Sequence, residues 1–407
     1  MRVLMTTGDH LMIDRRILQE ASSLHKRGYS TTLLAGFECN KAEDYSIGAT
    51  KIVRSVYDWG DSRFGRVANR FKLTPGSQNH TKAWKIFKYW SENIANLNSF
   101  ENFVLDRMLE HDADIVHAHD LPMLPSAVRY ANIKSVPLIY DAHEIYYSQV
   151  QFPKEVQDKY RNMEKRLIGR ASATITVNPF LADLMKQRYR ARRPHVIYNA
   201  SPLQAITYSN RLRSTLGLTQ DARIVLYQGW ISDNRGIERL VEAAKYFDPD
   251  IYFVVIGYGA FTDALKSLAE QKKVSDKVKF YGGVSSDDLH ELTCDADLGV
   301  IPYYGVDDNN LYCSPNKLFE FAVAELPFIA NDLPFLKSIV EQFGCGLLSD
   351  LSSPESIAHT VNRLFSNPSQ ISKLKQGARE AREHLNWSVE ERKLLAIYED
   401  LLSNNRN

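Results

Sequence analysis

The sequence predicts an α/β protein with two doubly wound parallel sheets, each covered by helices on both faces. Short apolar runs of strand length recur along the chain, and stretches with helical periodicity separate most of them. This pattern is typical of parallel strands buried between helices. The runs are too many for one eight-stranded barrel. The length of 407 residues suits two domains or more at roughly 150 residues each.

The apolar runs of the first half have the length of fully buried strands. They cover 2–6, 30–35, 51–56, 114–119, 136–141, 174–178 and 195–199. The second half repeats the pattern. Its runs cover 223–228, 251–257, 277–281, 298–302, 326–330 and 346–348. Helical periodicity is clear in 235–246 and 260–272, and segment 387–402 predicts an amphipathic helix with Leu394, Leu395 and Tyr398 on one side.

A polar connector at 200–221 divides the two series of strands. We therefore expect one domain over 1–203 and a second over 204–384. Periodicity alone does not show which domain the C-terminal helical segment, 385–407, covers, and we expect it to return to the first. Parallel sheets of this kind bind ligands beyond the carboxyl ends of their strands. Two such edges facing each other would enclose a cleft.

The composition excludes several classes of protein. Hydrophobic residues make up 44% and charged residues 24% of the chain, close to the globular average, which disfavours disorder and coiled coil. Lys plus Arg is 50 against 49 for Asp plus Glu, so no global field favours nucleic acid. The four cysteines lack metal or disulfide spacing, and no long apolar stretch occurs, so we expect a cytoplasmic protein without a signal or membrane span.

The segment 312–330 is the most informative one. Ser314 suits a helix N-cap and Pro315 the first helical position, so a helix with free amide groups is expected to begin there. Lys317 lies in the first turn, where a cation opposes the helix dipole unless an anion is bound. Glu320 follows one turn later. The pair could be an ordinary surface ion pair, or Lys317 could bind a phosphate and Glu320 a ribose diol.

A second segment, 226–240, ends a strand at Gly229 and delivers Arg235 to the start of the next helix. Arginine at this edge can form a bidentate contact with a diphosphate, or it can pair with a surface carboxylate. The chain has no complete GxGxxG and no Walker loop, so a dinucleotide oxidoreductase is poorly supported.

Taken in order, these motifs resemble the retaining glycosyltransferases of family 4, which have two Rossmann-like domains in the GT-B architecture. The matching pieces are Asp114-Ile-Val-His-Ala-His-Asp120, Tyr140-Asp-Ala-His143-Glu144, Ile197-Tyr-Asn199, the loop 229–236, Val255-Ile-Gly-Tyr-Gly259, Phe280-Tyr-Gly-Gly-Val284 and Pro315-Asn-Lys-Leu-Phe-Glu320. The resemblance runs over essentially the whole chain. It implies transfer of a sugar from a nucleotide diphosphate, UDP or GDP above all, with retained anomeric configuration and no metal or other cofactor.

The resemblance also assigns roles to residues. It places Glu320 on the nucleotide ribose, Arg235 on the diphosphate and His143 near the transferred sugar, and it makes His143, Arg235 and Lys317 the catalytic set. The other expected donor-side residues are Tyr312, Ser314, Asn316, Gly229, Gly283 and Asn199. The acceptor-side candidates are Asp14, Arg15, Asp120 and Glu144, although a helix salt bridge explains Asp14 and Arg15 equally well.

Two positions depart from the family pattern. Tyr312 stands where the family commonly has the first of two glutamates, and Trp230 stands where it has the first of two phosphate-binding cations. Lys317 could supply the missing charge, and with Arg235 it could stabilise the leaving diphosphate without metal. No pair of carboxylates can be placed across the sugar, so a covalent two-step mechanism is not supported.

The segment 51–90 is locally basic, with nine Lys or Arg against two Asp, and aromatic residues are interleaved. Such a segment can bind an anionic membrane surface, although aromatic residues at helical spacing also form cores. We expect a glycan or lipid-linked acceptor, with a site of action at the inner face of the plasma membrane, and no nucleic acid. The alternatives are a nucleotide-sugar 2-epimerase and a non-catalytic partner subunit.

Overall fold

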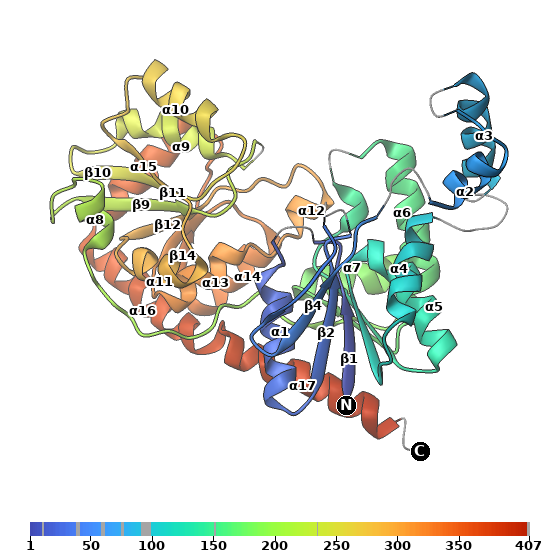
Figure 1. Ribbon diagram of the computed structural model, residues 1–407. Helices are drawn as coiled ribbons and strands as arrows, with labels where there is room; N and C mark the ends of the chain where they lie inside the picture. The colour runs from blue at the N-terminus through green and yellow to red at the C-terminus, as the bar shows by residue number, and fades with distance from the viewer. Residues whose placement is uncertain are drawn as a thin grey trace. The chain divides into compact units, whose positions relative to one another are not determined.

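The computed structural model describes residues 1–9, 12–37, 41–57, 62–74, 77–90, 99–149, 152–233 and 235–404. It divides the chain into two compact units (Figure 1). The first unit comprises Met1–Thr176, Ala182–Val196 and Leu394–Asn407, and the second comprises Val177–Leu181 and Ile197–Lys393. The division thus falls seven residues before the boundary placed after residue 203, and the chain crosses between the units more than once.

The first unit contains an eight-stranded sheet in the order β3-β4-β2-β1-β5-β6-β7-β8. Its strands are β1 (Arg2–Thr6), β2 (Ser30–Ala35), β3 (Glu43–Ile47), β4 (Thr50–Arg54), β5 (Ile115–His119), β6 (Leu138–Ala142), β7 (Ala173–Thr176) and β8 (His195–Val196). All pair in parallel except β3, an exposed edge strand antiparallel to β4. The sequence analysis missed β3 because Glu-Asp-Tyr-Ser-Ile has no apolar run.

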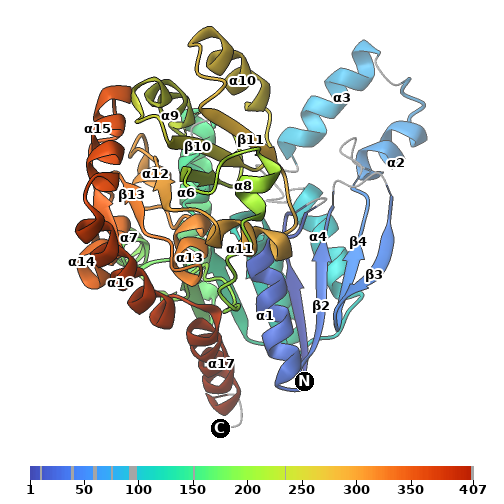
Figure 2. The same cartoon turned by 90° about the vertical axis from the view of Figure 1, so that its left-hand side faces the viewer.

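Side chains alternate between the two faces of this sheet. His117 and His119 of β5 face α1 (Arg15–Lys26), whereas Tyr140 of β6 points to the opposite face and donates to Glu164 of α6 (Lys154–Leu167). The α6 face also carries α4 (Ser99–Leu109) and α5 (Leu124–Lys134), which pack together (Figure 1). Figure 2 shows α4 and α6 in a view turned by 90°. The first unit further includes α7 (Pro179–Tyr189) beyond residue 181 and single 3₁₀ turns at Leu121–Met123, Tyr146–Ser148 and Ile168–Arg170.

The second unit contains a fully parallel six-stranded sheet in the order β11-β10-β9-β12-β13-β14. Its strands are β9 (Arg223–Gln228), β10 (Ile251–Ile256), β11 (Val278–Gly282), β12 (Leu298–Ile301), β13 (Phe328–Ala330) and β14 (Gly346–Leu348). Its helices are α8 (Arg211–Thr215), α9 (Ile237–Ala243) with a 3₁₀ turn Ala244–Tyr246, α10 (Thr262–Gln271), α11 (Ser286–Cys294), α12 (Asp308–Leu311), α13 (Asn316–Val323), α14 (Pro334–Phe343), α15 (Pro354–Phe365) and α16 (Pro368–His384).

Two apolar cores sandwich the second sheet, as expected for a doubly wound fold. On one face, alternate strand residues such as Val225 and Val255 pack with α9, α10 and α15. On the other face, Ile224 and Val254 pack with α11, α13, α14 and α16. The helices of the two layers are visible on opposite sides of the sheet in Figure 1.

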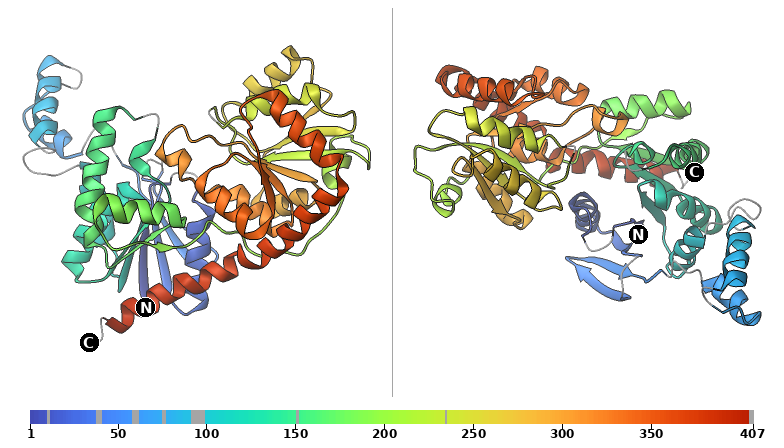
Figure 3. Two further views of the ribbon diagram at one scale, coloured as in Figure 1. Left: turned by 180° about the vertical axis from the view of Figure 1, so that it is seen from behind. Right: turned by 90° about the horizontal axis from the view of Figure 1, so that it is seen from above.

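The locally basic segment forms α2 (Ser62–Arg70) and α3 (Gln78–Tyr89), which pack as a helical hairpin (Figure 3). Phe64 is 2% exposed and contacts Trp84 and Phe87, with ring centroids 5.0 Å and 5.6 Å away. Part of the aromatic pattern is therefore the core of this hairpin. Asp58 and Asp61 lie outside the described residues.

Helix α17 (Trp387–Asn404) belongs to the second unit as far as Lys393 and to the first from Leu394 onwards. Leu394, Leu395 and Tyr398 are buried on one side, together with Ile397. The Tyr398 hydroxyl lies 2.9 Å from His117 Nδ1 of β5. Among the described residues, no helix is both long enough and apolar enough to cross a membrane.

Candidate functional site

A buried lysine lies at the carboxyl edge of the second sheet. Lys317, in the first turn of α13, is only 5% exposed. Its ammonium donates to the Tyr303 hydroxyl at 2.6 Å and lies 4.4 Å and 4.5 Å from the ring centroids of Tyr303 and Tyr227. Among the described residues, no carboxylate oxygen lies within 4.0 Å of this nitrogen. The ion pair with Glu320 that the sequence left open is therefore not formed.

Arg235 approaches the same tyrosine. Its guanidinium carbon lies 4.6 Å from the centroid of the Tyr303 ring, so two cations share one aromatic side chain. Burial alone raises the pKa of the Tyr303 phenol, but the charges of Lys317 and Arg235 outweigh burial and bring the pKa below its usual value. The region is strongly electropositive, and a phosphate group would compensate it.

Glu320 lies one turn after Lys317, and a residue of the sheet, Gln228, orients its carboxylate. Its Oε2 accepts from Gln228 Nε2 at 2.6 Å, and Gln228 Oε1 in turn accepts from the Thr293 hydroxyl at 2.8 Å. Gln228 is completely buried at the end of β9. This chain of hydrogen bonds fixes one carboxylate oxygen and restricts the rotation of the other.

The expected start of α13 was wrong by one residue. Pro315, not Ser314, is the N-cap, with φ −66° and ψ 128°, and the helix begins at Asn316. Proline fixes φ and cannot donate, and here its extended ψ keeps it outside the helix. The Ser314 hydroxyl is buried and has no hydrogen-bond partner among the described residues, whereas Asn316 is exposed. The carbonyl of Tyr312 accepts from Asn178 Nδ2 at 2.7 Å.

Glycines bring the neighbouring loops close together. A Cβ on Gly257 would lie 2.0 Å from the Gly229 oxygen, and one on Gly283 would lie 2.8 Å from the ring of Tyr258. Trp230, at the position of a family cation, instead packs edge-to-face on Tyr258 with 5.3 Å between ring centroids. At this edge of the second unit, Lys317 and Arg235 are thus the cations that contact the Tyr303 ring.

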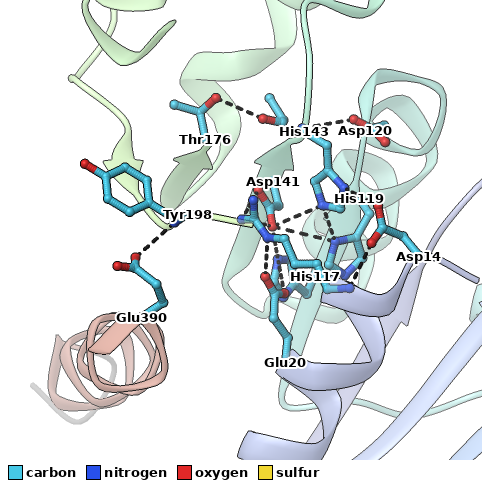
Figure 4. Close-up of polar contacts among 12 residues, drawn as sticks. Asp14, Glu20, His117, His119, Asp120, Asp141, His143, Thr176, Tyr198 and Glu390 are labelled. Carbon is cyan, nitrogen blue, oxygen red and sulfur yellow. Dashed lines mark hydrogen bonds and ion pairs between the residues drawn. The ribbon is translucent and has the colours of Figure 1, made fainter. Parts of the chain in front are cut away.

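A second polar cluster lies at the carboxyl ends of β5 and β6 in the first unit (Figure 4). His143 Nε2 lies 3.3 Å from Asp141 Oδ2 and 3.2 Å from His119 Nδ1. Its Nδ1 lies 3.8 Å from Asp14 Oδ2. Burial opposes a charge on His143, but Asp120, Asp141 and Asp14 raise its pKa well above the usual value. We therefore treat His143 as an imidazolium.

The backbone of Asp120 is strained. This residue has φ 63° and ψ 163°, a region that is essentially restricted to glycine and costs about 1–3 kcal/mol for other residues. Its Oδ1 accepts from the His143 backbone N–H at 3.0 Å. Burial, together with the charges of Glu144 and Asp141, raises the pKa of Asp120 to about 7, although His143 opposes the shift.

Asp14 and Arg15, two acceptor-side candidates, stand at the start of α1. Asp14 is the N-cap and accepts from the Arg16 backbone N–H at 2.8 Å, and Arg15 is the first helical residue. Burial raises the pKa of Asp14, but the contact with His143 lowers it to about 2 overall. Asp14 thus both caps the helix and pairs with His143.

Glu144 and Asn199 are the remaining candidates from the sequence. Glu144 accepts from Gln149. Asn199 follows Tyr198, whose N–H donates to Glu390 of α17 at 2.9 Å (Figure 4).

Behind His143 lies a buried network built around Arg16. The guanidinium donates to both oxygens of Asp141, at 2.8 Å and 2.7 Å, and to Glu20 Oε1 at 2.8 Å. Glu20, His117, His119 and Asp141 have ligand atoms close enough together for a metal ion. However, Arg16 already donates to both carboxylates, and a divalent cation beside a guanidinium would be repelled. We interpret the cluster as an ion-pair network.

Sequence reasoning missed several residues at these sites. Tyr303 and Gln228 follow or end buried strands, and their position at the sheet edge was the available signal. Arg16 and Glu20 lie four residues apart on the apolar side of α1, where charged residues are buried only when paired. No signal in the sequence distinguished their partners.

Comparison with known proteins identifies the family. Residues 13–204 match the family described as "Glycosyltransferase Family 4", and residues 209–381 match "Glycosyl transferases group 1". The chain therefore belongs to the family 4-type glycosyltransferases with the GT-B fold.

Individual relatives agree with this assignment. The chain is 27% identical to the putative glycosyltransferase EpsD of Bacillus subtilis (strain 168) over 66% of this chain and 72% of that protein. It is 29% identical to the alpha-galactosylglucosyldiacylglycerol synthase of Streptococcus pneumoniae, over 47% of this chain and 48% of that protein. The solved structure of Anabaena HepE with UDP and glucose matches with a TM-score of 0.71 at 16% identity, covering 98% of this chain and all of that one.

Proposed function

We propose that this glycosyltransferase transfers a sugar from a nucleotide-diphosphate sugar to a glycan or lipid-linked acceptor, with retention of configuration and without a metal. The observation that carries the proposal is the buried Lys317 without a carboxylate partner. Burying an uncompensated charge is costly, and tyrosine rings offset that cost only in part. An anionic ligand that lies against Lys317 and Arg235 would supply the missing charge.

The residues next to Lys317 and Arg235 suit the ribose of a nucleotide. Glu320, held by Gln228, presents a carboxylate that can accept from two ribose hydroxyls. The solved complex of HepE with UDP and glucose has the same fold, which supports a nucleotide-sugar donor, and the family resemblance favours UDP or GDP. The same resemblance assigns His143 to the transferred sugar.

Lys317 and Arg235 would stabilise the charge that develops on the diphosphate as the bond from the sugar C1 to the phosphate oxygen breaks. The acceptor oxygen forms the new bond to C1 on the same face. The acceptor proton passes to the departing phosphate, so no protein base is required. His143, as an imidazolium, would donate to the sugar and hold it in place.

The donor site is tested by calorimetric titration of the protein with UDP, GDP, ADP and CDP in the presence of EDTA. We expect micromolar binding of one of them. Lys317→Ala, Arg235→Ala and Glu320→Ala should each weaken binding, and the first two should each cost about 2 kcal/mol or more in transition-state stabilisation, as for other desolvated charged contacts. Lys337→Ala is the matched control, because Lys337 is exposed and pairs with Asp332.

The results of these measurements distinguish the proposed function from its alternatives. Binding that requires a divalent ion would contradict metal independence. Absence of binding by all four nucleotides would favour a non-catalytic partner subunit, which Tyr312 and Trp230 at the positions of family Glu and Arg residues suggest. Acceptor-independent interconversion of the sugar would favour a 2-epimerase.

The anomeric configuration of the product is tested separately by NMR of the sugar released when water serves as acceptor, and an inverted anomer would exclude retention.

We also propose that the hairpin of α2 and α3 brings the enzyme to an anionic membrane at the inner face of the plasma membrane. Phe71 and Ile86 are 69% and 70% exposed, and Tyr89 is exposed beside them. Exposed basic residues on the same hairpin include Arg70, Lys72, Lys82 and Lys85. Apolar and basic side chains together suit an interfacial surface, and the relative from S. pneumoniae is named as a glycolipid synthase.

Flotation with phosphatidylglycerol liposomes at low salt tests the membrane proposal. We expect binding that is lost in a Lys82→Gln, Lys85→Gln, Ile86→Ser variant and is unaffected by Lys337→Gln. Failure of the wild-type protein to float with these liposomes would refute the proposal. Equal binding to phosphatidylcholine liposomes would show that charge plays no part.

A further inference from the structure

Tyr303 contacts both cations of the donor site. It lies two residues after the end of β12 at Ile301, it is buried, and its backbone oxygen accepts from Asn331 Nδ2 at 3.0 Å. Its hydroxyl accepts from Lys317 at 2.6 Å, and its ring faces Arg235 with 4.6 Å to the guanidinium carbon. Asn331 therefore holds the backbone of Tyr303, while its hydroxyl is bonded to Lys317 and its ring contacts Arg235.

Two like charges on one ring repel each other, and contact with an electron-rich side chain offsets part of this repulsion. A phenol can serve both, because its oxygen accepts a hydrogen bond and its π face attracts a cation. Tyr227 also offers a ring face to Lys317, with 4.5 Å from the ammonium to the ring centroid, and its hydroxyl donates to the Trp230 oxygen at 2.9 Å. Tyr303 contacts both cations and therefore links Lys317 to Arg235.

We propose that Tyr303 is a positioning residue that holds Lys317 and Arg235 close together so that both bind one diphosphate group. The inference rests on the proposed function, since it assigns a ligand to these cations. Tyr303 acts through Lys317: without its hydroxyl, the ammonium loses its directional acceptor and no longer has one fixed position. Binding of the donor's diphosphate must then order the lysine side chain, and this lowers the affinity.

The test measures binding of inorganic pyrophosphate and of UDP, GDP, ADP and CDP by calorimetry. Tyr303→Phe keeps the ring and removes the hydroxyl, and we expect about tenfold weaker binding of pyrophosphate and of the preferred nucleotide, the effect of losing one hydrogen bond to a charged group. Tyr303→Leu removes the ring as well and should weaken binding further. Tyr304→Phe is the matched control, because that hydroxyl donates to Leu351 and that ring faces Arg239 instead.

A double-variant cycle separates positioning from a general loss of structure. In a Lys317→Met background, adding Tyr303→Phe should change affinity by less than about twofold, because the partner of the hydroxyl is gone. An unchanged affinity in Tyr303→Phe, or the same tenfold loss with and without Lys317, overturns the proposal. If wild type binds none of the probes, the proposed function itself fails. If wild type binds and Tyr303→Phe matches it, only this inference fails.

Discussion

Arg16 sits between two carboxylates where no water reaches it. Asp141 receives both bonds from one guanidinium nitrogen, and Glu20 receives the bond from Nε. The two acids cannot be equally ionised, since one cation compensates only one of them fully. Burial and the charge of Asp141 raise the pKa of Glu20 to about 8, despite Arg16. Asp141 therefore carries the charge that faces His143, and Glu20 is protonated at neutral pH.

This assignment predicts a pH dependence of stability. The pKa of Glu20 rises from about 4.5 in the unfolded chain to about 8 in the fold, so the folded state binds the extra proton between these values. Stability from this group is present below pH 4.5 and is lost as pH rises toward 8. Glu20→Gln mimics the protonated acid. Denaturant unfolding should show wild type losing stability relative to this variant between pH 5 and pH 8.

Glu110→Gln serves as the control for this measurement, because Glu110 is half exposed and pairs with Arg107 on the surface. A difference between wild type and Glu20→Gln that is flat, or that grows in favour of wild type as pH rises, would show that Glu20 is ionised in the fold.

The sequence singled out the charged residues of the candidate donor site but not the residues that contact them. Lys317, Arg235 and Glu320 were candidates because each stands at a recognisable strand or helix end. Tyr303 and Gln228 were not, because they act across 14 and 92 residues of chain, to Lys317 and Glu320 respectively. Such contacts depend on the order of strands in the sheet, which a single sequence does not display.

At the scale of elements, apolar runs located the parallel strands because these strands are buried on both faces. They failed for β3, whose exposed edge needs no apolar residues. Local turn chemistry was less reliable: Ser314 has the right side chain for an N-cap, yet the backbone of Pro315 takes that position. The bounds of α13 therefore depend on tertiary context as much as on propensity.

The loop between β9 and α9 requires glycine at position 236. Gly236 has φ +75°, and an added Cβ would lie 2.6 Å from the Tyr304 ring and 2.7 Å from the Pro302 oxygen. We expect Gly236→Ala to move the loop that carries Arg235, to lower the unfolding free energy by roughly 2 kcal/mol or more, and to abolish nucleotide binding. Thermal unfolding and calorimetry measure the two effects.

Gly217→Ala is the matched control for this change. Gly217 also has positive φ, at +65°, but an added Cβ there meets nothing within 4 Å. It should therefore cost only about 1 kcal/mol from backbone strain and leave nucleotide binding intact. Equal effects of the two substitutions would mean that strain, and not the close approach of Tyr304 and Pro302, governs position 236.

At the scale of the whole molecule, α17 is the element that both units share along the chain. Leu394, Leu395, Ile397 and Tyr398 are buried, and burying a large apolar side chain contributes roughly 1.5–3 kcal/mol. Truncation after Lys393 should destabilise the first unit by several kcal/mol in thermal or denaturant unfolding. Truncation after Asp400, which keeps all four residues, should have a small effect, and a large one would place the stabilising contacts at Leu401 and Leu402 instead.

The division of the chain also bears on how the protein folds as it is synthesised. N-terminal domains generally fold first on the ribosome, but here the first unit lacks its last helix until residue 404 has been added. The second unit is complete at Lys393, so it can finish first although most of it is made later. Until then the nascent first unit lacks Tyr398, the residue that covers His117 and the ion-pair network behind it.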